Sequence, residues 1–323
     1  MAKVDILVPG LLPAKSVETL RGLFACHRLE GHVGVDAIPA DVAGRIRGIA
    51  RGGHFPVGRD LIDRLPALEI IANFGVGYDG IDLARCAERG IVVTNTPDVL
   101  TEEVADTALG LLLMTVRELS AAERHLRAGR WEREGTYRLT PATLRNRTVG
   151  IAGLGRIGLA IARRLDAMNV PVVYHTRSPK PGVPYRYYAD LIDMAKAVDT
   201  LIVVLPGTAA TRGAVDAAVL RALGPDGILV NIGRGSVVDE PALIEALRSR
   251  TIHAAGLDVF ADEPRVPAEL FDLDNVVLLP HVGSASVFTR DAMGQLMIDN
   301  LTSWFEAGKP LTPVPETPWP AKA

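Results

Sequence analysis

The stretch TVGIAGLGRIGLAIARRLDAM, residues 148–168, decides the fold of this chain. It reads as a short apolar strand, a glycine-rich turn and a helix, which is the context that a GxGxxG motif requires. The first glycine allows a tight turn, the second lets the backbone approach a pyrophosphate, and the third lets the helix pack against the sheet. The helix N-terminus then presents amide groups to phosphate oxygens. The motif therefore predicts a dinucleotide site that includes Gly153, Gly155, Arg156, Ile157 and Gly158.

Apolar, β-branched runs alternate with helix-like segments on both sides of this turn. After the turn, further strands are expected at residues 170–175, 200–206, 227–233, 252–259 and 276–280. Five or six such strands make a doubly wound parallel sheet. Before the turn, a smaller parallel α/β unit is expected from runs at 4–9, 45–51, 68–75 and 90–95. The predicted fold class is α/β, with two doubly wound parallel-sheet domains.

Two segments with helical character connect these domains. Residues 101–130 contain no proline and predict one long helix that leads into the second domain. Residues 286–308 predict a helix that returns to the first domain. The expected domains are thus 1–99 with 287–323, and 100–286. The proline-rich end, LTPVPETPWPAKA, is expected to be irregular and exposed.

Length and composition narrow the class of function. A chain of 323 residues exceeds the size at which a single core usually stops growing, which agrees with two domains. Its 35 basic and 38 acidic residues give a net charge of -3, which offers no general attraction to nucleic acid or to an anionic membrane. The longest apolar stretch, residues 108–116, is about half of the ~20 residues that cross a bilayer. Two cysteines without metal-ligand spacing predict a cytoplasmic protein with reduced thiols and no metal site. The expected ligand is a small molecule.

The loop after the second strand of the dinucleotide domain predicts which cofactor is bound. A site selective for NAD usually carries an acidic residue here for the ribose 2′-hydroxyl. No acid lies between residues 171 and 180. Instead, Thr176, Arg177 and Ser178 can surround a 2′-phosphate, because a guanidinium matches phosphate oxygens in a bidentate way. The loop favours NADPH, with NADH as a weaker alternative, and the competing interpretation is a solvated basic loop without a ligand.

Six sequence blocks together carry a resemblance to a known family. They are NFGVGYDGID (73–82), GLGRIG (153–158), LPGTAATRG (205–213), NIGRGSVVDEPAL (231–243), AAGLDVFADEP (254–264) and PHVGSASVFTR (280–290). With these blocks the chain resembles the D-isomer-specific 2-hydroxyacid dehydrogenases, and within them it is most similar to NADPH-preferring glyoxylate/hydroxypyruvate reductases and to 2-ketogluconate reductases. The resemblance implies a Rossmann cofactor domain inserted in a flavodoxin-like substrate domain, with the active site in the cleft between them. It also implies a homodimer with contacts through residues 101–130.

The resemblance indicates the catalytic residues, and elementary chemistry agrees with it. Hydride reduction of a 2-keto acid leaves negative charge on the carbonyl oxygen, so the site needs a proton donor that titrates near neutral pH. His281 suits this role, since it follows a strand at the edge where open sheets bind ligands. Glu263 resembles the acid that orients this histidine. Arg234, in a glycine-flanked turn, resembles the residue that binds the substrate carboxylate and polarises the keto oxygen. A structural salt bridge is the alternative for this arginine.

The loop around Val76 and Gly77 offers a second contact for the substrate carboxylate, through its backbone amides. A tight connection between a strand and a helix is the alternative interpretation. By resemblance alone, Asp258 faces the nicotinamide carboxamide. Other cofactor-lining positions implied in the same way are Thr107, Leu205, Pro206, Thr211, Ile232 and Gly283.

The predicted function is that of an oxidoreductase which reduces glyoxylate, hydroxypyruvate or 2-ketogluconate with NADPH to the D-2-hydroxy acid. Two alternatives stay open. One is a dehydrogenase for a larger or aromatic 2-hydroxy acid. The other is an NAD(H)-sensing, corepressor-like binding protein, since such proteins share the fold and the same three catalytic residue types.

Overall fold

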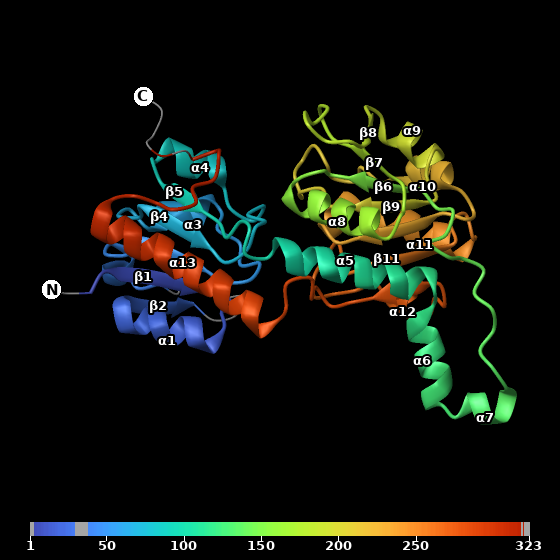
Figure 1. The fold of residues 1–323 in the computed structure, drawn as a ribbon. Coiled ribbons are helices and arrows are strands. Elements are labelled where there is room, and N and C mark those ends of the chain that lie inside the picture. The colour runs from blue at the N-terminus through green and yellow to red at the C-terminus, as the bar shows by residue number, and fades with distance from the viewer. Residues whose placement is uncertain (1–2, 30–37, 318, 320–323) are drawn as a thin grey trace. The chain divides into compact units, whose positions relative to one another are not determined.

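The chain divides into two compact units, each built on one parallel sheet (Figure 1). The computed structural model describes residues 3–29, 38–317 and 319. The first unit comprises 1–100 together with 286–323, and the second comprises 101–285. Helices cover the faces of both sheets, so the predicted α/β class with two doubly wound sheets is confirmed.

The sheet of the first unit has five parallel strands in the order β2-β1-β3-β4-β5, which is the order of a flavodoxin-like fold. The strands are β1 (Asp5–Pro9), β2 (Ala25–Leu29), β3 (Gly48–Arg51), β4 (Ile70–Asn73) and β5 (Val92–Thr94). Every residue of the last three is buried, as expected of strands that are covered on both faces.

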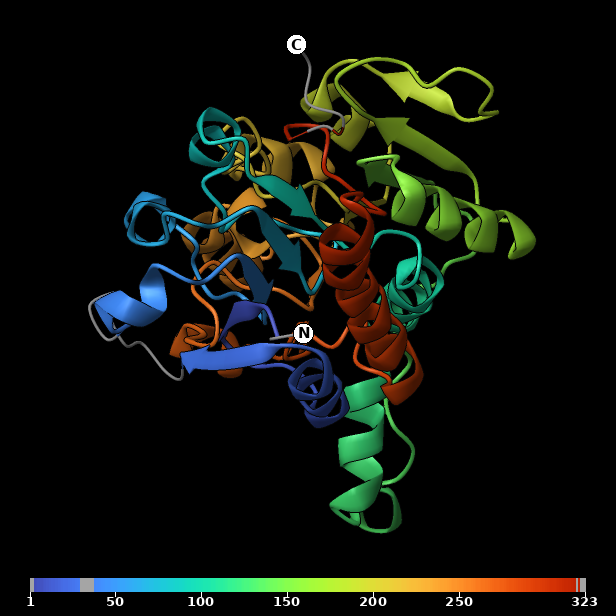
Figure 2. The same cartoon turned by 90° about the vertical axis from the view of Figure 1, so that its left-hand side faces the viewer.

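Helices pack on both faces of this first sheet. α1 (Ala14–Leu23) and α13 (Val287–Ala307) contact each other, and α13 also lies against β3 and β4 (Figure 2). The opposite face carries the short helices α2 (Ala40–Ala43), α3 (Arg59–Arg64) and α4 (Leu83–Glu88). Apolar residues of these three helices form one core with the inward side chains of the strands.

The second unit contains seven parallel strands in the order β12-β11-β10-β9-β6-β7-β8, a Rossmann arrangement with one added edge strand. The strands are β6 (Val149–Ala152), β7 (Val172–His175), β8 (Arg186–Tyr188), β9 (Thr200–Val203), β10 (Ile228–Asn231), β11 (Ala254–Leu257) and β12 (Val276–Leu278). α5 (Thr101–Val116) and α8 (Arg156–Ala167) pack together and against the sheet. The core on the other face includes residues of α9 (Leu191–Lys196), α10 (Ala217–Leu223), α11 (Glu240–Arg248) and α12 (Ala268–Phe271).

The prediction of one long helix over residues 101–130 is wrong. α5 ends at Val116, and the chain continues as α6 (Leu119–Arg127) and α7 (Arg130–Glu134), which project from the second unit (Figure 1). The break lies at Glu118, whose backbone is left-handed with a φ of 51°. Its carboxylate accepts hydrogen bonds from the Tyr137 hydroxyl at 2.8 Å and the Arg138 guanidinium at 2.7 Å. These contacts offset the conformational free-energy cost of the left-handed backbone at Glu118. They form with residues about 20 positions away, so helix propensity, which is a local property, does not predict them.

Three further features differ from the sequence prediction. β2 and β8 were not predicted, because both are edge strands whose sequences, ACHRL and RYY, lack a buried apolar run. The proline-rich end is not simply exposed, since Val314 and Thr317 are buried. The Val314 amide donates to the carbonyl of Val93 in β5 at 2.9 Å. Residues 318 and 320–323 of that end lie outside the described residues. Among the helices that the structure describes, none has the length and apolar character needed to cross a membrane.

Candidate active site

The carboxyl ends of the central strands of the second unit form one continuous edge. Main-chain hydrogen bonds of 2.8 to 3.1 Å continue the sheet beyond the strands, from Gly153 N to His175 O, Val204 N to Ala152 O, Ile232 N to Val203 O and Asp258 N to Asn231 O. The turns that contain most of the predicted site residues therefore start side by side. This edge is where open parallel sheets bind their ligands.

The glycine-rich turn has the geometry that a phosphate requires. Gly153 adopts a φ of +103°, and a Cβ on Gly158 would lie 2.2 Å from the carbonyl oxygen of Gly153. In contrast, a Cβ on Gly155 would meet nothing within 4 Å. No side chain caps the N-terminus of α8 at Gly155. The backbone at Gly155 is therefore open to a ligand, directly before the Arg156 and Ile157 amides that begin α8. This arrangement fits the pyrophosphate of a dinucleotide.

The loop after β7 is shaped by its own hydrogen bonds. The Thr176 hydroxyl donates to the carbonyl of Ser178 at 2.7 Å, and the Tyr187 hydroxyl donates to the carbonyl of Thr176 at 3.1 Å. The side chain of Arg177 is exposed and forms no hydrogen bond or ion pair with the described residues. An ordered loop that presents an arginine to solvent fits a phosphate ligand better than a structural salt bridge.

Four of the predicted cofactor-lining residues come together beside this edge. The Thr107 hydroxyl donates to the carbonyl of Gly283 at 3.2 Å. A Cβ on Gly283 would lie 3.0 Å from Asp258 Oδ2 and 3.5 Å from Ile232 Cδ1. The remaining residues, Leu205, Pro206 and Thr211, lie in or next to the loop after β9, where the Thr211 hydroxyl donates to the Pro206 carbonyl at 2.5 Å. Their contacts with a cofactor stay predictions.

Arg234 lies in a tight turn after β10 that a buried carboxamide shapes. Asn231, 1% exposed, accepts the Gly233 amide at 3.1 Å and donates to the carbonyl of Arg234 at 3.0 Å. A Cβ on Gly235 would lie only 1.8 Å from the carbonyl carbon of Phe260, so the turn packs directly on the loop after β11. Sequence reasoning missed Asn231, although its place just before the turn is the one signal that could have found it.

His281 and Glu263 form a direct pair. The two residues are 18 positions apart in sequence, and Nδ1 of His281 lies 2.7 Å from Oε2 of Glu263. The other carboxylate oxygen accepts the Phe260 amide at 3.0 Å, which fixes the plane of the carboxylate. His281 has a left-handed backbone with a φ of 53°, which is uncommon outside glycine. With Nδ1 directed to the carboxylate, a proton passed to a substrate would come from Nε2, a role that stays a prediction.

Asp258 is fully buried and organises the backbone that carries His281. Its carboxylate accepts the amides of Val282 at 2.7 Å and Gly283 at 2.9 Å, and its carbonyl accepts the His281 amide at 2.9 Å. Burial raises the pKa of Asp258, and these hydrogen bonds oppose the rise. The sequence did not predict this anchoring role. The expected contact of Asp258 with the nicotinamide carboxamide stays a prediction.

Val76 and Gly77 belong to the first unit, in the loop after β4. The amides of residues 75–78 donate no hydrogen bond within the described part of the chain, and these residues are half-buried. Unpaired main-chain donors of this kind suit an anion. The predicted role of this loop with a substrate carboxylate stays a prediction.

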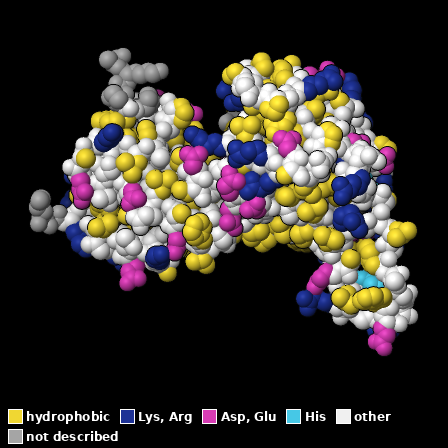
Figure 3. Space-filling view, in the orientation of Figure 1, with side chains coloured by type: hydrophobic (Ala, Val, Ile, Leu, Met, Phe, Trp, Pro, Cys, Tyr) yellow, Lys and Arg dark blue, Asp and Glu magenta, His cyan; other side chains and the backbone are white. Residues whose placement is uncertain are grey.

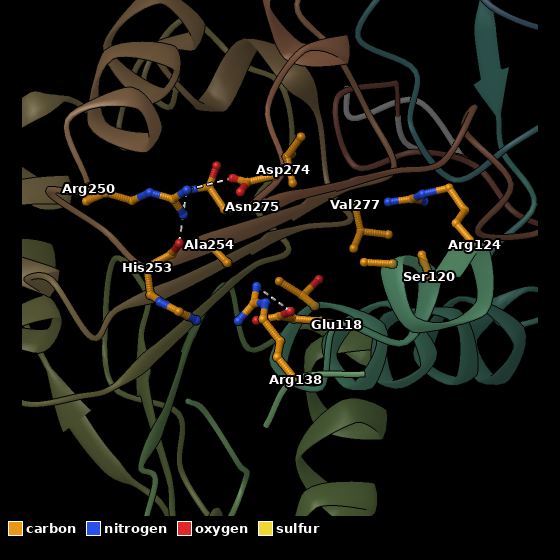
Figure 4. A pocket seen from close by; sticks show the side chains of 13 residues that line it. Glu118, Ser120, Arg124, Arg138, Arg250, His253, Ala254, Asp274, Asn275 and Val277 are labelled. Atoms are coloured by element: carbon orange, nitrogen blue, oxygen red, sulfur yellow. Dashed lines mark hydrogen bonds and ion pairs between the residues drawn. The ribbon is translucent and has the colours of Figure 1, made fainter. Parts of the chain in front are cut away.

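A separate pocket of about 240 Å³ in the second unit contains none of the predicted site residues (Figure 4). It lies beside the first residues of β11 and β12, at the end of the sheet opposite to His281. Two of its arginines are paired inside it, Arg138 with Glu118 at 2.7 Å and Arg250 with Asp274 at 2.6 Å. Its position and its internal ion pairs separate this pocket from the candidate active site.

Comparison with known proteins identifies the family. Residues 109–283 match the family model described as D-isomer specific 2-hydroxyacid dehydrogenase, NAD binding domain. This chain belongs to the D-isomer-specific 2-hydroxyacid dehydrogenase family. The predicted family, enzyme class and dinucleotide cofactor are thereby confirmed.

Three members of the family illustrate the range of its relatives. An NADPH-dependent glyoxylate/hydroxypyruvate reductase of Sinorhizobium meliloti, solved in complex with NADP and malonate, is 56% identical with a TM-score of 0.96, and the match covers 100% of both chains. A 2-ketogluconate reductase of Gluconobacter oxydans is 41% identical over 97% of this chain and 99% of its own. A hydroxyphenylpyruvate reductase of Plectranthus scutellarioides is 48% identical over 83% of this chain and 85% of its own.

Proposed function

We propose that this dehydrogenase reduces small 2-keto acids, such as glyoxylate, hydroxypyruvate and 2-ketogluconate, to D-2-hydroxy acids with NADPH. The observation that carries the proposal is the pair of His281 and Glu263 at 2.7 Å, at the same sheet edge as the Arg234 turn and the glycine-rich turn. The reductases of Sinorhizobium meliloti and Gluconobacter oxydans support the substrate class.

Each catalytic residue has a defined task in this proposal. The guanidinium of Arg234 binds the substrate carboxylate and polarises the keto oxygen, and the amides of Val76 and Gly77 bind the same carboxylate. His281 donates a proton from Nε2 to the oxygen on which negative charge develops. Glu263 keeps the imidazole oriented and stabilises its positive charge. The bound nicotinamide supplies the hydride.

The residues of the second unit have matching tasks toward the cofactor. We propose that residues 101–285 form the dinucleotide-binding domain and that the first unit forms the substrate domain. The amides of Arg156 and Ile157 would bind the pyrophosphate, and Arg177 with Thr176 and Ser178 would bind the 2′-phosphate.

Initial rates of NADPH and NADH oxidation test the function. The substrates are glyoxylate, hydroxypyruvate, 2-ketogluconate and phenylpyruvate. Turnover of the small acids with a preference for NADPH is expected. Faster turnover of phenylpyruvate would support the alternative of an aromatic substrate, which the Plectranthus scutellarioides relative favours. Nucleotide binding without turnover of any acid would contradict the proposal and favour a nucleotide-sensing binding protein.

Arg177→Ala tests the cofactor preference. Charge-assisted hydrogen bonds to a phosphate are worth about 1.5–3 kcal/mol, so the ratio of kcat/KM with NADPH to that with NADH should fall by about 10- to 100-fold. Arg186→Ala is the matched control, since this neighbouring arginine stacks on Tyr188 with 4.8 Å between guanidinium and ring. An equal loss with both cofactors in Arg177→Ala would remove the argument.

We also propose a homodimer that forms through α6 and α7, and a cytoplasmic location. Hydrophobic side chains lie on the surface of the projecting part in Figure 3. Four large apolar side chains on or next to these helices are exposed, namely Leu119, Leu126, Trp131 and Leu139. Both cysteines carry free thiols, which agrees with a reducing compartment.

The oligomeric state can be measured by light scattering coupled to size-exclusion chromatography. A double substitution, Leu126→Asp with Trp131→Asp, should convert a dimer to a monomer. Phe271→Asp, at an exposed apolar residue of α12, is the control and should leave the mass unchanged. A monomeric native protein would contradict the proposed dimer.

A further inference from the structure

The loop at residues 74–78 is held from one side by a buried carboxamide. Asn73, the last residue of β4, is 1% exposed. Its Nδ2 donates to the carbonyl of Gly75 at 2.9 Å and to the carbonyl of Gly77 at 3.0 Å. One side chain thus fixes the direction of two of the peptide groups in the loop that is proposed to bind the substrate carboxylate.

A second carboxamide holds the peptide between them. Nδ2 of Asn95 donates to the carbonyl of Val76 at 3.0 Å. Asn95 is itself fixed from the C-terminal segment, because its carbonyl accepts the hydroxyl of Thr312 at 2.6 Å. Three consecutive carbonyls, those of residues 75, 76 and 77, therefore each accept a hydrogen bond from an asparagine.

The orientation of Asn73 is set by an arginine. Nη1 of Arg51 donates to Oδ1 of Asn73, and Nε of Arg51 donates to the carbonyl of Phe55 at 2.6 Å. Arg51 is 3% exposed. A guanidinium can only donate hydrogen bonds, so it must face the oxygen of the carboxamide, and the NH₂ group must face the loop.

Peptide geometry connects these contacts to the amides of the loop. In a trans peptide the C=O of one residue and the N–H of the next point in opposite directions. When the carbonyls of residues 75–77 are turned toward the two asparagines, the amides of Val76, Gly77 and Tyr78 are turned away from them. Within the described residues these three amides donate no hydrogen bond, so they stay available to an anion.

We infer that Arg51, Asn73 and Asn95 are positioning residues that fix the amides of residues 76–78 in the direction of the 2-keto acid carboxylate. This inference rests on the proposed function, because it assigns the anion of the loop to the substrate. The two carboxamides hold the loop carbonyls, so the N–H groups of residues 76–78 are already oriented before the substrate arrives. Donors that are oriented in advance stabilise an anion more strongly than donors that must first reorient.

Asn73→Asp tests the inference with little change in size. The substitution keeps an oxygen for Arg51 and replaces the two N–H donors with an acceptor, which repels the carbonyls of Gly75 and Gly77. The KM for the keto acid should rise by at least about tenfold, as expected from the loss of two hydrogen bonds of about 1 kcal/mol each. The KM for NADPH should stay within about twofold, since Asn73 belongs to the first unit.

The matched control is Asn275→Asp. Nδ2 of Asn275 also donates to two carbonyls, those of Leu247 at 3.2 Å and His253 at 3.0 Å, but in the second unit and away from every residue assigned to the site. It should leave the KM for the keto acid unchanged. An unchanged KM in Asn73→Asp, or an equal rise in both variants, would overturn the inference. If Asn73→Asp does not fold, Asn95→Asp, which removes the donor to Val76, decides in its place.

Hydrogen–deuterium exchange separates this inference from the proposed function. In Asn73→Asp two hydrogen-bonded amides at this loop should exchange faster than in the wild-type protein, namely that of Phe74, which donates to the carbonyl of Arg51 at 3.0 Å, and that of Thr96, which donates to the carbonyl of Gly75 at 3.0 Å. Neither should change in Asn275→Asp. Unchanged exchange would show that Asn73 does not hold the loop. Absence of keto acid reduction by the wild-type protein would defeat the proposed function, whereas the exchange result would still decide whether the carboxamides position these amides.

Discussion

The pair of His281 and Glu263 can be tested by one change that keeps its shape. Glu263→Gln removes the charge of the side chain. One carboxylate oxygen accepts the Phe260 amide at 3.0 Å and the other lies 2.7 Å from Nδ1 of His281. A backbone amide is always a donor, so the oxygen of the glutamine must stay with Phe260. The NH₂ group then faces His281 and favours the neutral imidazole, which cannot act as the proton donor.

The expected size of the effect follows from the geometry. Two unit charges about 4 Å apart attract by about 4 kcal/mol at an effective dielectric constant of about 20. The side chains of His281 and Glu263 are 29% and 21% exposed, so solvent screens part of this energy. The net value of about 1.5–3 kcal/mol for a hydrogen bond to a charged group is the better measure. Since every 1.36 kcal/mol corresponds to about a factor of ten in rate, kcat/KM should fall by about 10- to 100-fold.

The assay is steady-state reduction of the preferred keto acid by NADPH across the neutral pH range. The quantity compared is kcat/KM, which should be lower in Glu263→Gln than in the wild-type protein. The control is Glu240→Gln, because Glu240 accepts the amide of Ala261 at 3.2 Å in the same loop. A kcat/KM for Glu263→Gln within about twofold of wild type, or a loss of equal size in Glu240→Gln, would refute the reasoning.

Three other substitutions test the packing, the proton transfer and the alkaline stability of the protein. Gly235→Ala should lower the unfolding midpoint well below that of Gly110→Ala, because a Cβ at Gly235 would lie 1.8 Å from a main-chain carbon whereas one at Gly110 meets nothing within 4 Å; equal midpoints would contradict the packing. His281→Ala should lower turnover by about 100-fold or more while NADPH binding, measured by fluorescence, persists; retained turnover would exclude this proton donor. Burial, followed by the contact with a nearby glutamate, raises the pKa of Tyr78 to about 12. The unfolded value is about 10, so the protonated phenol stabilises the fold below pH ~10 and this stability is lost as the pH rises through the folded pKa. Tyr78→Phe should therefore lose less stability than wild type between pH ~10 and ~12 in thermal unfolding, and parallel curves would argue against the shift.

The fold was predictable where the signal is local. The strand before Gly153 and the helix after it follow from a run of apolar residues and the glycine spacing. Likewise, the places of Arg234 and His281 after strands follow from apolar segments that end in turns. The edge strands β2 and β8 escaped prediction because each pairs with one strand only and most of their residues are half-buried or exposed, so neither sequence needs a continuous apolar run.

The sequence by itself determined the family, the two parallel sheets, the kind of cofactor and the residues proposed for catalysis, because these depend on short motifs and on the periodicity of apolar residues. Only the tertiary structure decided the break at Glu118, the anchoring of residues 282 and 283 by Asp258, and the hold of Asn73 on the loop after β4. Each of these features depends on hydrogen bonds between residues, and at Glu118 such bonds also offset the cost of a left-handed backbone. The partner of a buried donor or acceptor is set by which segments of the chain pack around it. The same residue type therefore forms different hydrogen bonds at different places in the fold, and the local sequence does not specify them.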